Sequence, residues 1–263
     1  MTHGFVAMGD GCRIAYRFDG PSDAPVLLLS NSLGTAMGMW APQLPAFTRD
    51  YRVLRYDSRG HGASDAPAGG YAMDRLGRDV VELADALQLA RFHFCGLSLG
   101  GMVGQWLGIL EPDRLINLIL ANTSGYMGPP SGWDARIAAA LGQGMAPLAE
   151  ASVTRWFTPG FAARDRAAIR PVEAMLLATD PVGYAGCCAA IRDMDMRRTA
   201  TLIDAPTLVI GGAQDPATPA AHGEALAAAI AGARLTMLDA AHLSNVEQPE
   251  AFAQAVLDHI AGG

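Results

Sequence analysis

Residues 94–101 read Phe-Cys-Gly-Leu-Ser-Leu-Gly-Gly and place Ser98 between Gly96 and Gly100. An apolar, aromatic run with the composition of a short β-strand precedes the serine, and a helix-forming stretch, 102–110, follows it. Glycines are needed two positions before and after the serine because side chains there would clash across a sharp strand-to-helix turn. The stretch therefore predicts a nucleophile elbow, in which the turn presents Ser98 at the end of a sheet strand.

The rest of the chain predicts an α/β fold with an open, mostly parallel, eight-stranded sheet flanked by helices. Asp10-Gly11 separates the first two apolar runs and indicates an antiparallel hairpin. The later runs show no clean alternation, which is typical of strands covered on both faces. Residues 71–89 carry apolar side chains at helical spacing and are expected to form a flanking helix. The expected strands span 5–8, 13–18, 26–29, 51–56, 92–95, 118–120, 207–210 and 235–238.

The stretch 124–201 breaks the alternation of strands and helices, because it contains no convincing strand. It is far longer than a crossover between parallel strands requires. We therefore expect a helical cap at 124–201, inserted into a core formed by 1–123 and 202–263. The expected cap helices span 134–141, 147–156, 165–177 and 181–191.

Composition and charge exclude several classes of protein. The formal net charge is -7, which disfavours nucleic acid and anionic membranes as partners. All 19 basic residues other than histidine are arginines. The absence of lysine excludes Schiff-base and pyridoxal-phosphate enzymes, P-loops and Ser-x-x-Lys hydrolases, since each needs a lysine amine.

The four cysteines, Cys12, Cys95, Cys187 and Cys188, have the spacing of neither a zinc site nor a disulfide framework. The N-terminal stretch lacks the pattern of a secretory leader, and the chain contains no apolar run of membrane-spanning length. We therefore expect a cytoplasmic protein with reduced thiols. The sequence does not indicate an oligomeric state.

A serine hydroxyl needs an imidazole to accept its proton and a carboxylate to orient that imidazole. His242 follows the last expected strand and precedes the last helix, so its loop can return to the elbow. His61 is the only serious rival, because it also lies in a loop. The order of triad residues in this fold is serine, acid, histidine.

Asp215 fits that order, since it follows the strand at 207–210 and lies between Ser98 and His242. Its alternative role is to cap the helix that Pro216 would begin. Asp239 is a competing acid, but it lies three residues before the histidine and would share its loop.

Ester hydrolysis passes through a tetrahedral oxyanion, which needs preorganised N–H donors. One donor is expected to be the backbone of Leu99, directly after the nucleophile. The other is expected from the loop at 31–34, with Leu33 as the candidate. The alternative for that loop is an ordinary polar turn.

Further segments carry a resemblance along the whole chain to the α/β-hydrolase superfamily, and within it to the 3-oxoadipate enol-lactonases. The Asn-Ser loop and the stretch around Cys188 are the more specific matches, although many relatives have His-Gly where this chain has Asn31-Ser32. The segments are 31–35, 54–57, 59–62, 93–101, 104–108, 155–159, 188–193 and 240–249.

The resemblance implies a triad of Ser98, Asp215 and His242, an acyl-enzyme and hydrolysis of 3-oxoadipate enol-lactone to 3-oxoadipate in aromatic catabolism. It implies no metal or organic cofactor and a small anionic lactone as substrate. The alternatives are a carboxylesterase or perhydrolase with the same triad, and a noncatalytic ligand receptor on this fold.

An anionic substrate that enters an acidic protein needs a local cation, and without lysine this must be arginine. The expected cap offers Arg136, beside Trp133, and Arg192. Trp133 is expected to form an apolar wall of the site. The alternative for Arg192 is an ion pair with Asp193 or Asp195 that holds the cap together.

Overall fold

Eight strands form one sheet in the order β1-β2-β4-β3-β5-β6-β7-β8 in the computed structural model, which describes residues 2–262. The pairs β1–β2 and β2–β4 are antiparallel, and all other neighbouring pairs are parallel. The predicted eight-stranded, mostly parallel sheet is therefore confirmed. The strands are β1 (Thr2–Ala7), β2 (Arg13–Asp19), β3 (Val26–Ser30), β4 (Arg52–Tyr56), β5 (Phe92–Leu97), β6 (Leu115–Ala121), β7 (Thr207–Gly212) and β8 (Arg234–Leu238).

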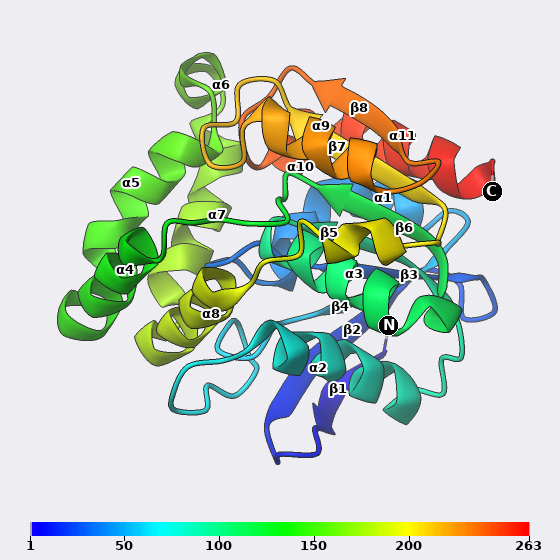
Figure 1. The fold of residues 1–263 in the computed structure, drawn as a ribbon, viewed down its shortest axis with the longest axis horizontal. Coiled ribbons are helices and arrows are strands. Elements are labelled where there is room, and N and C mark those ends of the chain that lie inside the picture. The colour runs from blue at the N-terminus through cyan, green and yellow to red at the C-terminus, as the bar shows by residue number, and fades with distance from the viewer. Residues whose placement is uncertain (1, 263) are drawn as a thin grey trace.

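Helices cover both faces of this sheet (Figure 1). One face carries α2 (Met73–Ala86), α3 (Leu99–Leu110) and α9 (Ala220–Ala229), and the other carries α1 (Leu44–Phe47) and α11 (Pro249–Ala261). Every residue of β3 and β5 is buried, which explains why these strands show no alternation in the sequence. The short elements η1 (Met37–Gln43), η2 (Pro112–Arg114), η3 (Thr199–Leu202) and α10 (Ser244–Glu247) complete the layers.

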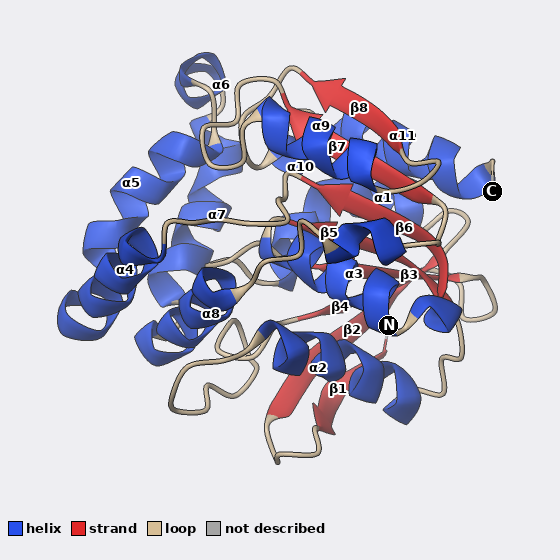
Figure 2. Ribbon diagram, in the orientation of Figure 1, coloured by secondary structure: helices blue, strands red, loops and turns tan. Residues whose placement is uncertain are grey.

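Five α-helices lie between β6 and β7 in the chain and gather at one end of the sheet (Figure 2). We call them the inserted helices: α4 (Pro130–Gln143), α5 (Ala146–Trp156), α6 (Pro159–Arg164), α7 (Arg166–Ala178) and α8 (Pro181–Asp193). Four of them match the predicted helices within a few residues. The prediction missed α6, which has only six residues and is too short to show helical periodicity.

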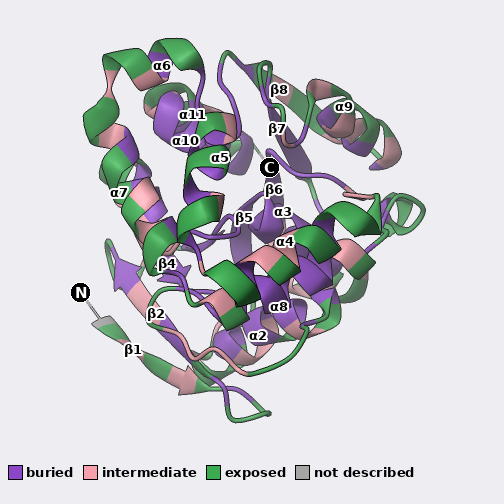
Figure 3. Ribbon diagram, turned by 90° about the vertical axis from the view of Figure 1, so that its left-hand side faces the viewer, coloured by how far each residue is buried: buried purple, intermediate pink, exposed green. Residues whose placement is uncertain are grey.

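Burial explains how the inserted helices sit on the sheet. Their outer faces are exposed, whereas their inner faces are buried (Figure 3). Leu176 of α7 and Tyr184 of α8 are almost fully buried, and a Cβ at Gly34, in the loop after β3, would lie 2.5 Å from Leu176 Cδ1. The carboxyl ends of the parallel strands therefore face the inserted helices, where ligands bind in open α/β sheets.

The division into a core of 1–123 and 202–263 and a cap of 124–201 stays a prediction. Within residues 2–262, no single helix is long and apolar enough to cross a membrane. The helices α7 and α8 together have sufficient length and apolar composition, but the chain bends sharply between them.

Candidate active site

The turn between β5 and α3 holds Ser98 in a conformation that side-chain-bearing residues rarely adopt, with φ 56° and ψ -112°. A Cβ at Gly96 would lie 2.1 Å from the carbonyl oxygen of Gly100. A Cβ at Gly100 would lie 2.2 Å from the carbonyl oxygen of Ser30. The two glycines therefore permit the close packing of strand, turn and helix that lifts the serine out of the sheet, and strained backbone of this kind is typical of functional sites.

The carboxylate of Asp215 is buried beside the imidazole of His242. Its Oδ2 lies 2.8 Å from His242 Nδ1 and also accepts hydrogen bonds from Asn122 Nδ2 and Thr218 Oγ1. Burial opposes the charge of the carboxylate, but the neighbouring histidine and these three hydrogen bonds outweigh it and lower the pKa of Asp215 to about 2. An ionised carboxylate accepts from Nδ1–H, so Nε2 of His242 is left as the proton acceptor.

Asp239, the competing acid, lies outside this arrangement. Its carboxylate is exposed and accepts a hydrogen bond from Gln214 Nε2 at 2.7 Å. Sequence reasoning missed Asn122, at the end of β6, which donates to Asp215 Oδ2 at 3.0 Å and to the carbonyl oxygen of Ala241 at 3.2 Å. The amide of Asn122 thus fixes the acid and the residue before the histidine relative to each other.

His61, the rival histidine, supports the loop that follows β3. Its Nε2 accepts a hydrogen bond from the Gly34 N–H at 2.9 Å, and its Nδ1 lies 3.2 Å from the carbonyl oxygen of Arg59. Because a carbonyl can only accept, Nδ1 carries the proton and the ring is neutral. Burial lowers the pKa of His61 to about 4. Both ring nitrogens are used, so the imidazole is not free to accept a proton from Ser98.

The loop after β3 is held on the elbow by its first residue. Asn31 Nδ2 donates to the carbonyl oxygen of Tyr56 at 2.7 Å, and its Oδ1 accepts from Trp40 Nε1 at 2.9 Å. The Asn31 carbonyl oxygen accepts from the Gly100 N–H at 3.0 Å. Among residues 2–262, the N–H groups of Leu33 and Leu99 have no hydrogen-bond partner. The loop and the elbow therefore leave two backbone donors free beside the serine.

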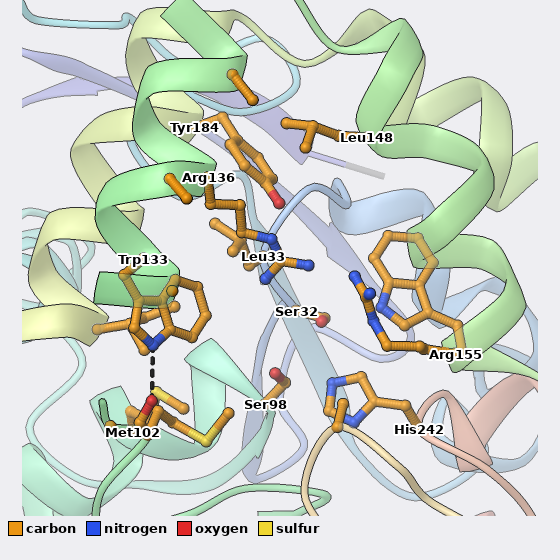
Figure 4. A pocket seen from close by; sticks show the side chains of 18 of the residues that line it. Ser32, Leu33, Ser98, Met102, Trp133, Arg136, Leu148, Arg155, Tyr184 and His242 are labelled. Atoms are coloured by element: carbon orange, nitrogen blue, oxygen red, sulfur yellow. Dashed lines mark hydrogen bonds between the residues drawn. The ribbon is translucent and has the colours of Figure 1, made fainter. Parts of the chain in front are cut away.

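A cavity of about 550 Å³ lies above the elbow, and Ser98 and His242 form part of its floor. Figure 4 shows the two side chains next to each other, with an imidazole nitrogen turned toward the serine. Trp133 lines the cavity and donates from Nε1 to the carbonyl oxygen of Met127 at 2.7 Å. The guanidinium of Arg136 lies 5.1 Å from the centre of the Trp133 ring. The apolar wall and one predicted arginine are therefore brought to the serine.

Arg192, the second predicted arginine, is not among the described residues that line this cavity. Its guanidinium lies 2.7 Å from Asp193 and 2.8 Å from Asp134. The structure thus corrects the expectation of a substrate contact and gives Arg192 its alternative role, because these ion pairs tie α8 to α4. Its place in the family-like segment 188–193 did not show which way the side chain points.

Arg155, at the end of α5, is the cationic lining residue that sequence reasoning missed. Burial and the nearby Arg136 lower the pKa of its guanidinium. Neither arginine forms an ion pair with any residue that the structure describes, and none of the described lining residues is acidic. The cavity therefore offers two unpaired cations in a chain whose formal net charge is -7.

Glu247 ties the inserted helices to the histidine loop, and this residue was also missed. Its buried carboxylate accepts from the N–H of Ala241 at 3.0 Å and from the N–H of Thr158 at 3.2 Å. It also accepts from the Thr158 hydroxyl. The N–H of Leu243 donates to the carbonyl oxygen of Trp156 at 3.0 Å. The end of α5 is thus fixed to the residues on both sides of His242.

Comparison with known proteins agrees with this geometry. A family model of the alpha/beta hydrolase fold matches residues 25–249. The 3-oxoadipate enol-lactonase 2 of Acinetobacter baylyi is 45% identical over 241 residues, which cover 92% of this chain and 90% of the relative. The structure of the enol-lactonase from Burkholderia xenovorans LB400 aligns with a TM-score of 0.96 at 43% identity and covers 98% of this chain and 100% of its own.

A hydrolase from Pseudomonas aeruginosa also aligns with a TM-score of 0.96, at 53% identity and over 98% of both chains. These matches extend over nearly the whole chain and include its sheet, its elbow and its inserted helices. The chain therefore belongs to the α/β-hydrolase family and, within it, to the family of the 3-oxoadipate enol-lactonases.

Proposed function

We propose that this protein hydrolyses 3-oxoadipate enol-lactone to 3-oxoadipate through an acyl-enzyme, with Ser98, His242 and Asp215 as its triad. The proposal rests on the set of side chains that meet at one cavity. A strained serine, an imidazole held by a buried carboxylate and two unpaired guanidiniums all meet there. The first two features suit an ester carbonyl, and the guanidiniums suit the carboxylate that this lactone carries beside its ring.

The first half of the reaction opens the ring. Ser98 Oγ attacks the lactone carbonyl while His242 Nε2 accepts the hydroxyl proton, and Asp215 stabilises the imidazolium. The free N–H groups of Leu33 and Leu99 receive the oxyanion, and a donor of this type contributes about 10² to 10³ in rate. The ring C–O bond then breaks, its electron pair passes to the enol oxygen, and His242 returns the proton to that oxygen.

The second half frees the enzyme. The enol remains attached to the acyl group on Ser98, and a water molecule that loses its proton to His242 attacks the acyl carbonyl. The bond between the acyl carbon and Ser98 Oγ then breaks, its electron pair goes to Oγ, and His242 returns the proton to that oxygen. The released enol becomes a ketone, which removes the nucleophile that would close the ring again. The overall reaction consumes one water molecule for each lactone opened.

Arg136 binds the substrate carboxylate, with Trp133 as the apolar wall beside the ring. Its guanidinium lines the cavity and is free of an acidic partner within residues 2–262. A charge-assisted hydrogen bond contributes about 1.5 to 3 kcal/mol, so Arg136→Met should raise KM for the anionic lactone about tenfold or more. The uncharged methyl ester of the lactone should be affected much less.

The experiment that tests this function is a comparison of substrates on one preparation. Opening the lactone yields a carboxylic acid that ionises at pH 7, so turnover is followed by the release of one proton in a pH-stat. We expect the enol-lactone to be hydrolysed with a higher kcat/KM than phenyl acetate, and Ser98→Ala to abolish both activities. Turnover of aryl esters alone indicates the carboxylesterase alternative. Binding of the lactone without any turnover indicates a receptor.

We also propose a division of the chain into two parts and a location in the cell. Residues 124–201 act as a cap that closes the cavity over the sheet ends, while 1–123 and 202–263 form the catalytic core. The location is cytoplasmic, which fractionation of cells with an antibody against the chain would test.

A further inference from the structure

Arg155 is left without an anionic partner if Arg136 binds the substrate carboxylate. The described lining residues supply two guanidiniums and no carboxylate, whereas the enol-lactone carries one carboxylate. Keeping a guanidinium half-buried without a partner is costly, and burial already lowers the pKa of Arg155. Asp215, the ionised acid behind His242, is engaged by His242, Asn122 and Thr218. The negative charge that Arg155 meets is therefore expected to arise on the reacting substrate.

The position of Arg155 indicates where that charge arises. Figure 4 shows the Arg155 side chain next to His242, and the neighbouring Trp156 carbonyl accepts from the N–H of Leu243 at 3.0 Å, whereas Arg136 enters the cavity from α4. The carbonyl oxyanion belongs at the N–H groups of Leu33 and Leu99. The leaving oxygen must instead face the histidine, because the imidazolium gives it a proton. Arg155 thus lies on the side of the cavity where the leaving oxygen departs.

The link through Glu247 keeps Arg155 there. Its carboxylate and the Leu243–Trp156 hydrogen bond fix the end of α5 to both sides of the histidine. A guanidinium on a freely moving cap would have to be brought into place in each turnover. Here the cation and the imidazole are carried by one hydrogen-bonded unit, which is the preorganisation that electrostatic catalysis requires.

We propose that Arg155 stabilises the negative charge that develops on the leaving oxygen as the ester bond breaks, while Arg136 binds the substrate carboxylate. The bond between the carbonyl carbon and the leaving oxygen breaks, its electron pair goes to that oxygen, and His242 supplies the proton. Arg155 donates a hydrogen bond and keeps its own proton. This inference rests on the proposed ester hydrolysis at Ser98 and deepens it.

The test is a series of phenyl acetates whose phenols differ in acidity, from 4-nitrophenol to phenol. The kcat/KM of such esters reports acylation, in which the phenoxide departs. With Arg155→Met we expect a loss of about 10- to 100-fold for phenyl acetate, the scale of one charge-assisted hydrogen bond. The loss should shrink to about threefold or less for 4-nitrophenyl acetate, whose leaving group needs little help. The dependence of rate on leaving-group pKa therefore becomes steeper.

Matched variants separate this role from a structural one. Arg155→Lys keeps a cation, so the dependence of rate on leaving-group pKa should return part of the way toward the shallower slope of the wild type. Arg136→Met and Arg170→Met, the latter at an exposed position on α7, should leave the slope as it is in the wild type. A uniform loss over the whole ester series with Arg155→Met would overturn the proposal, because it would indicate damage to the fold or the triad.

The enol-lactone and its methyl ester give a second readout. Arg155→Met should lower kcat on both to a similar extent, whereas Arg136→Met should raise KM on the anionic form alone. An Arg155→Met variant that only raises KM for the anion would show a second carboxylate ligand and refute the proposal. If instead Ser98→Ala retained esterase activity, the proposed function itself would fail, so the two failures are distinguishable.

Discussion

Replacing His61 by glutamine tests whether this imidazole is a structural support or a catalytic base. The ring is 1% exposed, accepts from the Gly34 N–H and donates to the Arg59 carbonyl oxygen. A glutamine amide oxygen can accept from the same N–H, but it does not titrate. Protonation of His61 would place a hydrogen on Nε2 against the Gly34 N–H, so acid must break the contact that supports the loop bearing Leu33.

The size of the effect follows from the pKa of His61, which burial lowers from 6.5 to about 4. Above pH 6.5 the imidazole is neutral in the folded and the unfolded chain, and it adds no pH dependence. As the pH falls from 6.5 toward 4, the unfolded chain binds a proton that the folded chain cannot, so the free energy of unfolding decreases. At about 1.4 kcal/mol per unit of pKa, this loss reaches about 3 kcal/mol by pH 4.

The assay is urea unfolding of the wild type and His61→Gln at several pH values between 7 and 4. The difference between their unfolding free energies should shift by about 3 kcal/mol in favour of the variant as the pH falls, because all other titrating groups are common to both. A difference that stays constant with pH would refute the buried, neutral imidazole. Activity at pH 7 should fall by no more than about 10²-fold, the scale of a disturbed oxyanion donor. A loss near 10⁶-fold would make His61 the base.

Two further predictions concern the triad and one concerns the thiols. His242→Ala should lose about 10⁶-fold in kcat, since triad members act as a unit, and a tenth of the wild-type rate would exclude this role. Asp215→Asn should fold normally and lose about 10⁴-fold through the wrong tautomer, whereas Asp239→Asn should keep near-normal kcat; the reverse pattern would exchange the two acids. Cys95 is fully buried and its pKa is raised by burial, so mild alkylation of the folded protein should leave turnover unchanged, and rapid inactivation that substrate prevents would contradict this.

The sheet and the elbow could be predicted because their signals are local. Continuous apolar runs without alternation indicated strands covered on both faces, and β3 and β5 are buried along their whole length. The glycines beside Ser98 were predictable for a similar reason. A Cβ added at Gly96 would lie 2.1 Å from the Gly100 carbonyl oxygen in the turn itself, and a Cβ added at Gly100 would lie 2.2 Å from the Ser30 carbonyl oxygen at the end of the adjoining strand. Both features are determined by residues close in sequence or by the fold's fixed topology.

The pairing of Asp215 with His242 was predictable from chain order, because each residue follows a strand and parallel strands end at one edge of the sheet. Chain order also indicated His242 rather than His61 but gave no reason for the burial of His61. That reason is a tertiary contact, the Gly34 N–H at 2.9 Å. The sequence of neither loop contains a pattern that predicts this contact between His61 and Gly34.

The walls of the cavity could not be predicted, because the orientation of the inserted helices depends on contacts distant in sequence. Arg192 lies in a segment that resembles the family, yet its guanidinium pairs with Asp134 and Asp193. Arg155 also begins a segment that resembles the family, 155–159, but nothing in that segment predicted its place in the site; it reaches the cavity because Glu247 fixes the end of α5. Arg192 has acidic side chains within ion-pair distance and Arg155 has none among the described residues. This difference depends on how the helices pack in the folded chain.

The same difference explains how an acidic protein can accept an anion. The net charge of -7 acts at long range and is screened within about 10 Å at ordinary ionic strength. The charged side chains among the described lining residues of the cavity are Arg136 and Arg155, and the ionised Asp215 behind His242 is already paired with that histidine. Local attraction therefore exceeds distant repulsion once the ligand enters. The ion pairs of Arg192 remove that cation from substrate binding and leave Arg136 and Arg155 as the arginines that line the cavity.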